Sequence, residues 1–189
     1  FEDMIVKYYP NRIKELENKI LGIEKDLNLV KNNTNIANEE NFSPMTLKER
    51  QYNKKEMAGK TILEICKTKE NSELEEIGEY RGMKLELQIN VARQEFELFL
   101  KGNSEYKISL GNDIYGNITR IDNALSNIGK ELEENKDELA NTKKQFENAK
   151  IDVKIPFDKE NELKEKLTKL DRVNALLKLD EKESIIMED

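Results

Sequence analysis

The chain has 189 residues, with 32 Lys and Arg against 39 Asp and Glu, so its formal net charge is −7. Charged residues make up 38% of the sequence, whereas they make up about a quarter of an ordinary soluble domain. There is no His and only one Cys, Cys66, which excludes His-based catalytic triads, His-ligated zinc and an internal disulfide. No apolar run approaches the roughly 20 residues that span a bilayer, which argues against a membrane protein.

The beginning of the chain gives a first expectation about its origin. The first six residues lack the basic and apolar regions of a signal peptide, and the chain opens on Phe1 rather than Met. We therefore expect a fragment of a longer protein and a cytoplasmic location. The high charge and sparse apolar residues favour long exposed helices over a thick globular core.

Residues 9–32 predict a helix with a narrow apolar seam. The seam residues are Ile13, Leu16, Ile20, Ile23, Leu27 and Val30. Their alternating spacing of three and four is typical of a helix that packs lengthwise against another helix. This element is the first arm helix, within residues 1–35, and the run Asn32–Asn35 is expected to end it.

Residues 36–112 predict a small α/β insert. A short helix is expected at 53–67, with Asn53 as its N-cap and with one apolar side formed by Met57, Ala58, Thr61, Ile62 and Ile65. Residues 42–52 are consistent with one short strand. Alternating apolar residues predict three further strands at about 80–90, 95–101 and 105–111.

Matching the apolar faces of these strands predicts their register. Residues directly opposite each other in an antiparallel pair lie on the same face of the sheet. The pairs that follow are Ile89–Phe96, Leu87–Leu98, Leu98–Ile108, Leu100–Tyr106 and Lys101–Glu105. The connections are then a loop at 91–94 and a three-residue loop at 102–104, and the result is a three-stranded meander covered by the short helix.

Residues 113–181 predict two further arm helices, followed by a frayed tail at 182–189. The first, at about 117–153, has a seam formed by Ile121, Leu125, Ile128, Leu132, Asn135, Leu139, Thr142, Phe146, Ala149 and Val153. Pro156 is expected to end it. The second runs from about Asp158, its N-cap, to Leu179, with a stripe formed by Leu163, Leu167, Leu170, Val173, Leu176 and Leu177.

The predicted fold class is therefore α+β. It consists of a long antiparallel helical arm, similar to a coiled coil, with an inserted small antiparallel β-meander and a short helix. The arm is expected to form from the first, penultimate and last helices, because three apolar seams can bury one another only side by side.

Sequence motifs predict no catalytic residue, no cofactor and no metal site. The chain has no phosphate-binding glycine loop and no cluster of metal ligands at useful spacing. Asp113 and Asp122 are two carboxylates among 39 acidic residues, a number in which such proximity is expected by chance. Cys66 could be a nucleophile, but a small buried hydrophobic residue is the favoured interpretation because no His is present to activate it.

Two segments offer candidate contacts for DNA or a partner. The first is basic and includes Lys54, Lys55, Lys60 and Lys67; the favoured interpretation is a solvated helix face, and contact with nucleic-acid phosphates is the alternative. The second is residues 110–125, where Asn112, Asp113 and Asn117 can cap a helix. In the alternative interpretation of this segment, the residues that contact a ligand or partner are Tyr115, Arg120 and Asn123.

Three stretches, Tyr8–Glu17, Ile77–Met83 (which contains Arg81, a further candidate contact) and Gly116–Asn123, resemble one family. It is the C-terminal region of very large DNA-processing proteins of bacterial conjugative transposons and phages. In those proteins a Swi/Snf-like helicase core is joined to an adenine-specific DNA methyltransferase module. The third stretch is the most distinctive, whereas Met83 stands where an aromatic residue is expected.

The resemblance implies a DNA-associated parent protein, without helicase or methyltransferase chemistry in this chain, which lacks the Walker loop and the Asn/Asp-Pro-Pro-Tyr/Phe signature. The expected role is a non-catalytic accessory domain that contributes DNA or partner contacts and orients the catalytic modules. Its expected partners are other domains of the parent, DNA and a second copy through the helical seams, with no membrane. The alternative is a coiled-coil oligomerisation or scaffold module with no DNA role.

Overall fold

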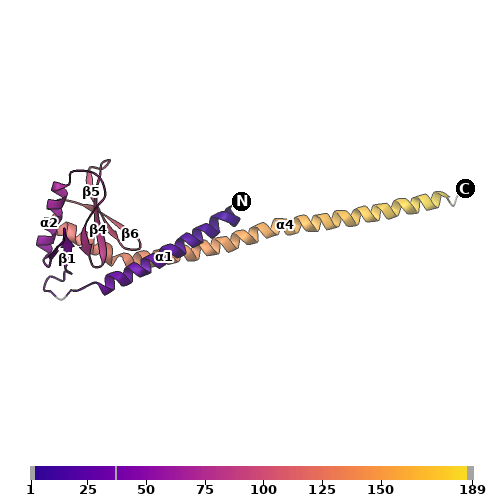
Figure 1. Ribbon diagram of the computed structural model, residues 1–189. Helices are drawn as coiled ribbons and strands as arrows, with labels where there is room; N and C mark the ends of the chain where they lie inside the picture. The colour runs from indigo at the N-terminus through magenta and orange to yellow at the C-terminus, as the bar shows by residue number, and fades with distance from the viewer. Residues whose placement is uncertain (1–2, 37, 187–189) are drawn as a thin grey trace. The chain divides into compact units, whose positions relative to one another are not determined.

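The computed structural model describes residues 3–36 and 38–186 (Figure 1). The chain divides into two compact units, Ile13–Ala140 and the paired segments Phe1–Arg12 and Asn141–Asp189. The larger unit contains a six-stranded sheet together with helices, and the smaller unit is helical. The predicted α+β class is confirmed at this general level.

The sheet is antiparallel throughout, in the order β2-β1-β3-β4-β5-β6. Its strands are β1 (Met45–Leu47), β2 (Arg50–Tyr52), β3 (Glu75–Tyr80), β4 (Met83–Asn90), β5 (Glu95–Lys101) and β6 (Glu105–Leu110). The predicted meander corresponds to β4, β5 and β6, and every residue pair predicted for it is present. Alternation of apolar residues was therefore sufficient to predict both the strands and their register.

The other half of the sheet differs from the prediction. The strand expected at 80–90 is β4, which begins only at Met83, because Arg81 and Gly82 have positive φ values of 49° and 82° and form the turn that connects it to β3. Residues 42–52 contain the β1–β2 hairpin rather than one strand. β3 was missed because it is rich in glutamate and has an irregularity between Glu76 and Gly78 that breaks the alternation.

Four helices contribute to the larger unit. They are α1 (Tyr9–Asn32), α2 (Lys55–Thr68), α3 (Ile114–Ser126) and α4 (Ile128–Ile186), with α1 included from Ile13 and α4 as far as Ala140. The bounds of α1 are those predicted. α2 is also confirmed as an element, but its N-cap is Lys54 rather than Asn53, with no side-chain cap, and Met57 is exposed.

One core joins the helices to the apolar face of the sheet. It includes residues from every helix and from five strands, among them Ile23, Ile62, Leu85, Leu98, Ile121 and Ile128, all with no exposed surface. Within this unit α1 lies antiparallel to the first turns of α4 (Figure 1). The ion pairs Lys19–Glu131 and Glu24–Lys136 connect the two helices. In the larger unit α1 therefore lies beside the beginning of α4, and the predicted three-helix arm is not confirmed as such.

The seam of α1 differs from the prediction at one position. Leu16, Ile20, Ile23 and Val30 are buried as predicted, but Leu27 is exposed and the fully buried residue beside it is Asp26. An aliphatic side chain would be the ordinary choice there. The carboxylate is accommodated because it accepts hydrogen bonds from the β5–β6 loop.

The two predicted arm helices at 113–181 do not exist as separate elements. α3 starts at Ile114, where Asp113 is its N-cap, and after Asn127 the single helix α4 continues through Pro156 to Ile186. Pro156 and Asp158 lie inside α4, although a proline inside a helix removes one backbone donor and its ring clashes with the carbonyl four residues earlier. The expected tail is helical as far as Ile186, and residues 187–189 lie outside the described residues.

In the smaller unit, a π-helical turn, η1 (Met4–Tyr8), precedes α1. Tyr9 stacks on Phe146 with ring centroids 5.5 Å apart, and the Lys150 ammonium lies 4.0 Å from the centre of the Phe146 ring. The predicted packing of the last helix beside the penultimate one is wrong, because both are parts of α4 and the leucines after Pro156 are exposed. None of the described helices is long and apolar enough to cross a membrane.

Candidate functional site

A groove of about 520 Å³ lies between the edge of the sheet and the α3–α4 junction in the larger unit. Its strand side is formed by the consecutive residues 105–108 of β6. Its helix side is formed by Arg120, Asn123, Ala124, Asn127 and Glu131. The structure therefore brings two sequence-predicted contact residues, Arg120 and Asn123, into one concave site.

Arg120 is held at one end of this groove by a buried amide. The Asn117 side chain clamps the backbone of Gly111: Oδ1 accepts from the Gly111 N–H at 2.8 Å, and Nδ2 donates to the Gly111 carbonyl at 2.9 Å. Arg120 Nη1 donates to the same Oδ1 at 3.0 Å, although the Arg120 side chain remains exposed. This hydrogen bond therefore anchors one end of the exposed guanidinium beside Asn117.

The opposite end of the groove is acidic and is organised by Asp26. The Tyr106 hydroxyl donates to Asp26 Oδ2 at 2.9 Å, and burial, together with the Asp26 carboxylate, raises the pKa of Tyr106 well above its usual value. Glu131 adds to this upward shift and lies 3.9 Å from Lys19. Arg120 and Glu131 thus give the two ends of the groove opposite charge.

Residues 110–125 agree in part with each of the two interpretations considered for them. Asp113 Oδ2 accepts from the Gly116 N–H at 3.0 Å, and Asn117 is fully buried, so these two residues satisfy backbone groups at the strand-to-helix junction. Arg120 and Asn123 face solvent one turn apart. Tyr115 is exposed as predicted, but it lies near Lys60 of α2 rather than in the groove.

Arg81 lies in a separate network that connects elements of the fold. Its Nε donates to Thr34 Oγ1 at 2.9 Å, and its Nη1 lies 3.8 Å from Asp122 Oδ1. Asp122 also accepts a 2.7 Å hydrogen bond from the Tyr80 hydroxyl, and burial raises the pKa of Tyr80 strongly. The Arg81 side chain is only 19% exposed, which leaves little of it for an external contact.

The four candidate lysines lie in α2 or at its N-cap. Lys60 lies 2.5 Å from Glu56, and their hydrogen bond raises the pKa of Lys60 and lowers that of Glu56. Lys67 is exposed on the same side of the helix, two turns further on. Lys54 caps the helix, and the Lys55 N–H donates to Glu40 at 2.9 Å. With Glu56 and Glu64 on the same side, the exposed face of α2 carries both signs of charge.

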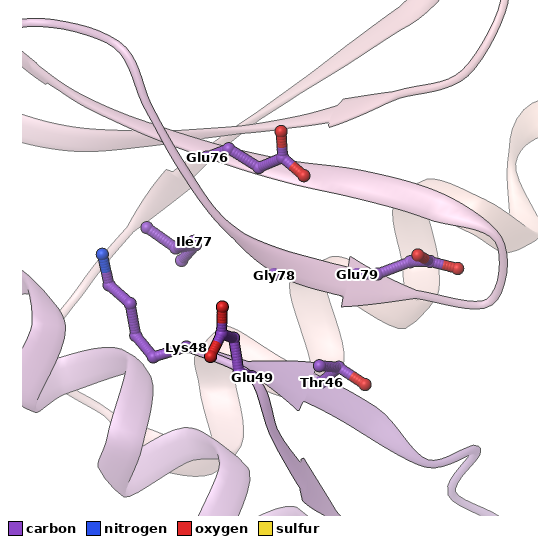
Figure 2. A pocket seen from close by; sticks show the side chains of 7 residues that line it. All are labelled: Thr46, Lys48, Glu49, Glu76, Ile77, Gly78 and Glu79. Atoms are coloured by element: carbon purple, nitrogen blue, oxygen red, sulfur yellow. The ribbon is translucent and has the colours of Figure 1, made fainter.

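A second hollow, of about 560 Å³, lies beside β1 and β3 (Figure 2). Gly78 is one of its lining residues, and β1 lies close to it: a Cβ at that position would lie 1.9 Å from the Thr46 carbonyl oxygen. The carboxylates of Glu49, Glu76 and Glu79 point in different directions (Figure 2). Among the described residues no group of three or more His, Cys, Asp or Glu could hold a metal ion.

Nearby charges are engaged within the fold. Glu75 accepts hydrogen bonds from Lys48 and from Lys69, whose side chain is almost completely buried, and these bonds lower the pKa of Glu75. Burial raises the pKa of the Cys66 thiol to about 11. Cys66 is 5% exposed, which confirms the interpretation of this residue as a small buried hydrophobic side chain.

Comparison with known proteins finds no matching family model, no similar curated protein and no similar solved structure. The functional argument therefore depends on the surfaces of the chain itself. These are the groove beside β6, the lysines of α2 and the exposed apolar stripe of α4.

Proposed function

We propose that the chain is a non-catalytic accessory domain of a large mobile-element DNA helicase/methyltransferase. It docks against other domains of the parent protein, orients the catalytic modules and contributes contacts to DNA or a partner. The observation that carries this proposal is the apolar stripe on the C-terminal part of α4, because such a stripe is completed by a second helix.

The stripe has the spacing of a helix–helix interface. Its residues are Leu163, Leu167, Leu170 and Leu177, between 52% and 58% exposed. A seven-residue frame that starts at Ile121 and Leu125 reaches these leucines without a break in α4. The same frame includes Ile128 and Leu132, which pack in the core of the larger unit, so the exposed leucines continue a pattern already used for packing.

The assignment to a DNA-processing parent rests on the sequence resemblance. Its most distinctive stretch, Gly116–Asn123, forms part of α3 and supplies Arg120 and Asn123 to the groove. The lysines of α2 offer a second surface for phosphate contacts. An accessory role is consistent with these surfaces, because the groove beside β6, the lysines of α2 and the apolar stripe of α4 are all suited to binding.

The docking part of the proposal is tested by amide hydrogen exchange. The backbone of α4 at 158–180 is expected to exchange rapidly in the isolated chain and at least tenfold more slowly in the intact parent protein, because docking would cover the stripe. The double variant Leu167→Glu, Leu170→Glu should remove this protection. Equal exchange in the two proteins would contradict docking through α4.

The DNA part is tested by gel shift with duplex and single-stranded DNA at two salt concentrations. A weak, salt-sensitive shift is expected, and it should be lost when Lys54, Lys55, Lys60 and Lys67 are changed to Glu. The matched control places the same four charge reversals on α4, at Lys164, Lys166, Lys169 and Lys178. Binding that survives the α2 changes would remove this surface from the proposal.

The second candidate is an oligomerisation or scaffold module without a DNA role. Asn174 favours it, because this residue occupies the seven-residue frame between Leu170 and Leu177. A single asparagine in such a seam can pair with its own copy and fix the register of a parallel dimer. Sedimentation velocity over a wide concentration range tests this candidate: a dimer lost in Leu167→Glu, Leu170→Glu supports it, and a monomer throughout rejects it.

A further inference from the structure

We propose that the outer edge of β6 binds an extended peptide, which pairs with β6 as an added strand and lies in the groove beside α3. β6 is the last strand in the sheet order, so alternate backbone N–H and C=O groups along Glu105–Leu110 point away from β5. In the described part of the chain, no other strand pairs with this edge. An open edge of this kind accepts a peptide through main-chain hydrogen bonds.

The groove lies in the position that such a peptide requires. Four consecutive β6 residues, 105–108, form one wall, and the α3–α4 junction forms the other. Ala124 lies in the middle of the helical wall, between Arg120 and Asn127, and its short side chain leaves space for a side chain of the peptide. A binding strand would thus have a backbone partner on one side and a side-chain pocket beside it.

Two of the usual features that block strand addition, a bulge and a proline, are missing from this edge. β6 pairs with β5 over six consecutive residues without a bulge, and it contains no proline. Lys107 is the only basic residue of the strand, and its ammonium lies 3.6 Å from Glu97 on the neighbouring strand. This ion pair directs the charge across the sheet towards β5, away from the open edge.

The order of charges along the groove predicts the chemistry of the peptide. Arg120 lies beside Gly111, because a Cβ on that glycine would be 3.2 Å from Arg120 Nη1. Glu131 lies near Tyr106, since its charge contributes to the raised pKa of the Tyr106 hydroxyl. A peptide antiparallel to β6, like all paired strands here, would pass Arg120 first and Glu131 last. The β6 neighbours of the two anchors, Gly111 and Tyr106, are five residues or about 16 Å apart along the strand, and peptide side chains four residues apart on the same face span about 13 Å, a difference that the long Arg, Glu and Lys side chains bridge. The ligand is therefore an extended segment with an acidic residue, a small apolar residue and a basic residue at alternate positions.

The test uses the acetylated, amidated peptide Thr-Glu-Thr-Val-Thr-Lys-Thr and the isotope-labelled full chain in an NMR titration. Saturable shifts are expected at the β6 amides and at Asn123 and Asn127, together with slower exchange of the outward-facing β6 amides. Exchanging the Glu and Lys of the peptide should weaken binding about fivefold, as expected for solvent-exposed ion pairs. The variant Arg120→Glu should remove this preference, because both ends of the groove are then acidic.

Two controls separate strand addition from other modes of binding. A peptide methylated on the backbone nitrogens that face β6 cannot donate to the strand and should bind at least about tenfold more weakly. Because Arg120 also supports Asn117, the exposed residue Asn123 provides a second variant: Asn123→Trp fills the groove and should abolish binding while leaving the spectrum folded. Equal binding of the methylated peptide, shifts confined to α2 or α4, or no shift at about 5 mM peptide would overturn the proposal. These outcomes are independent of docking through α4 and of DNA binding by α2.

Discussion

The hydroxyl of Tyr106 donates a 2.9 Å hydrogen bond to the carboxylate of Asp26, a residue 80 positions earlier in the chain. The same carboxylate accepts from the backbone N–H of Asn103 at 2.6 Å and of Ser104 at 2.8 Å, and from the Asn103 side chain at 3.0 Å. α1 thereby supplies the acceptor for a loop that cannot satisfy its own donors. This contact fixes the β5–β6 hairpin, and with it the edge strand and the acidic end of the groove.

Replacing Asp26 by Ala should destabilise the larger unit by about 3 kcal/mol, because one buried donor and three part-buried donors would lose their acceptor at once. Urea unfolding followed by circular dichroism measures the change. Asp137→Ala is the matched control, since Asp137 is an exposed acid on α4, and it should change stability by less than about 0.5 kcal/mol. Equal effects in the two variants would show that the Asp26 contacts contribute little.

Gly102 should tolerate no side chain while Asp26 is present. A Cβ at this position would lie 2.3 Å from Asp26 Oδ1 and 2.8 Å from Met83 Sδ. Gly102→Ala is therefore expected to cost about 1–3 kcal/mol through overpacking. In the Asp26→Ala background most of that cost should disappear, so a double-mutant cycle should give a coupling energy of about 1 kcal/mol or more. Strict additivity would mean that the two residues do not interact.

Substitution of Gly129, in the same unit, should have the opposite effect on the free energy of unfolding. It lies in the first turn of α4, and a Cβ there would meet no atom within 4 Å. Alanine is the better helix former, so Gly129→Ala should raise the free energy of unfolding by about 0.5–1 kcal/mol. The urea midpoint is the readout. A decrease would indicate that the turn around Asn127 requires the conformational freedom of a glycine at position 129.

These positions show what the sequence could predict and where it failed. The register of β4, β5 and β6 followed from face matching, because one face of each strand is buried and a shift by one residue would expose it. Asp26 gave no signal of this kind, since a seam pattern predicts an aliphatic residue at each contact position and Leu27 offered one next to it. The buried acid becomes understandable only when the loop at 102–104 lies against α1.

The prediction of the long helices failed for a different reason. Pro156 looked like an end because proline usually ends a helix, yet the seven-residue frame before it, at Ile121 and Leu125, is the same as the one after it, at Leu163 and Leu167. Continuity of that frame was the signal for a single helix. For the candidate site, Arg120 and Asn123 were singled out correctly as exposed residues, but the groove could not be predicted, because it depends on β6 being the edge of the sheet.

Alkaline pH should destabilise the larger unit through Tyr80 and Tyr106. Burial raises the pKa of both hydroxyls above the ordinary value of 10.0, because each is surrounded by protein and donates to a carboxylate. Their contribution to stability is complete below about pH 10 and is lost at higher pH, where the unfolded chain ionises and the folded chain does not. Urea midpoints should therefore fall from about pH 9.5 upwards. Tyr106→Phe should be less stable at neutral pH but show a shallower alkaline slope, and an unchanged slope would contradict this assignment.

Cys66 should be almost inert in the folded chain. Its thiol is 5% exposed, and burial raises its pKa to about 11, although the nearby Lys69 ammonium opposes the shift, so that at about pH 8 both thiolate and access are scarce. Reaction with an aromatic disulfide reagent should be about a hundredfold slower in buffer than in concentrated guanidinium. The variant Cys66→Ala, Ser184→Cys moves the thiol to an exposed position on α4 and should react rapidly under both conditions. Rapid reaction of native Cys66, at a rate similar to that of the Ser184→Cys thiol, would mean that α2 opens readily from the core and that Lys69 keeps the thiolate accessible.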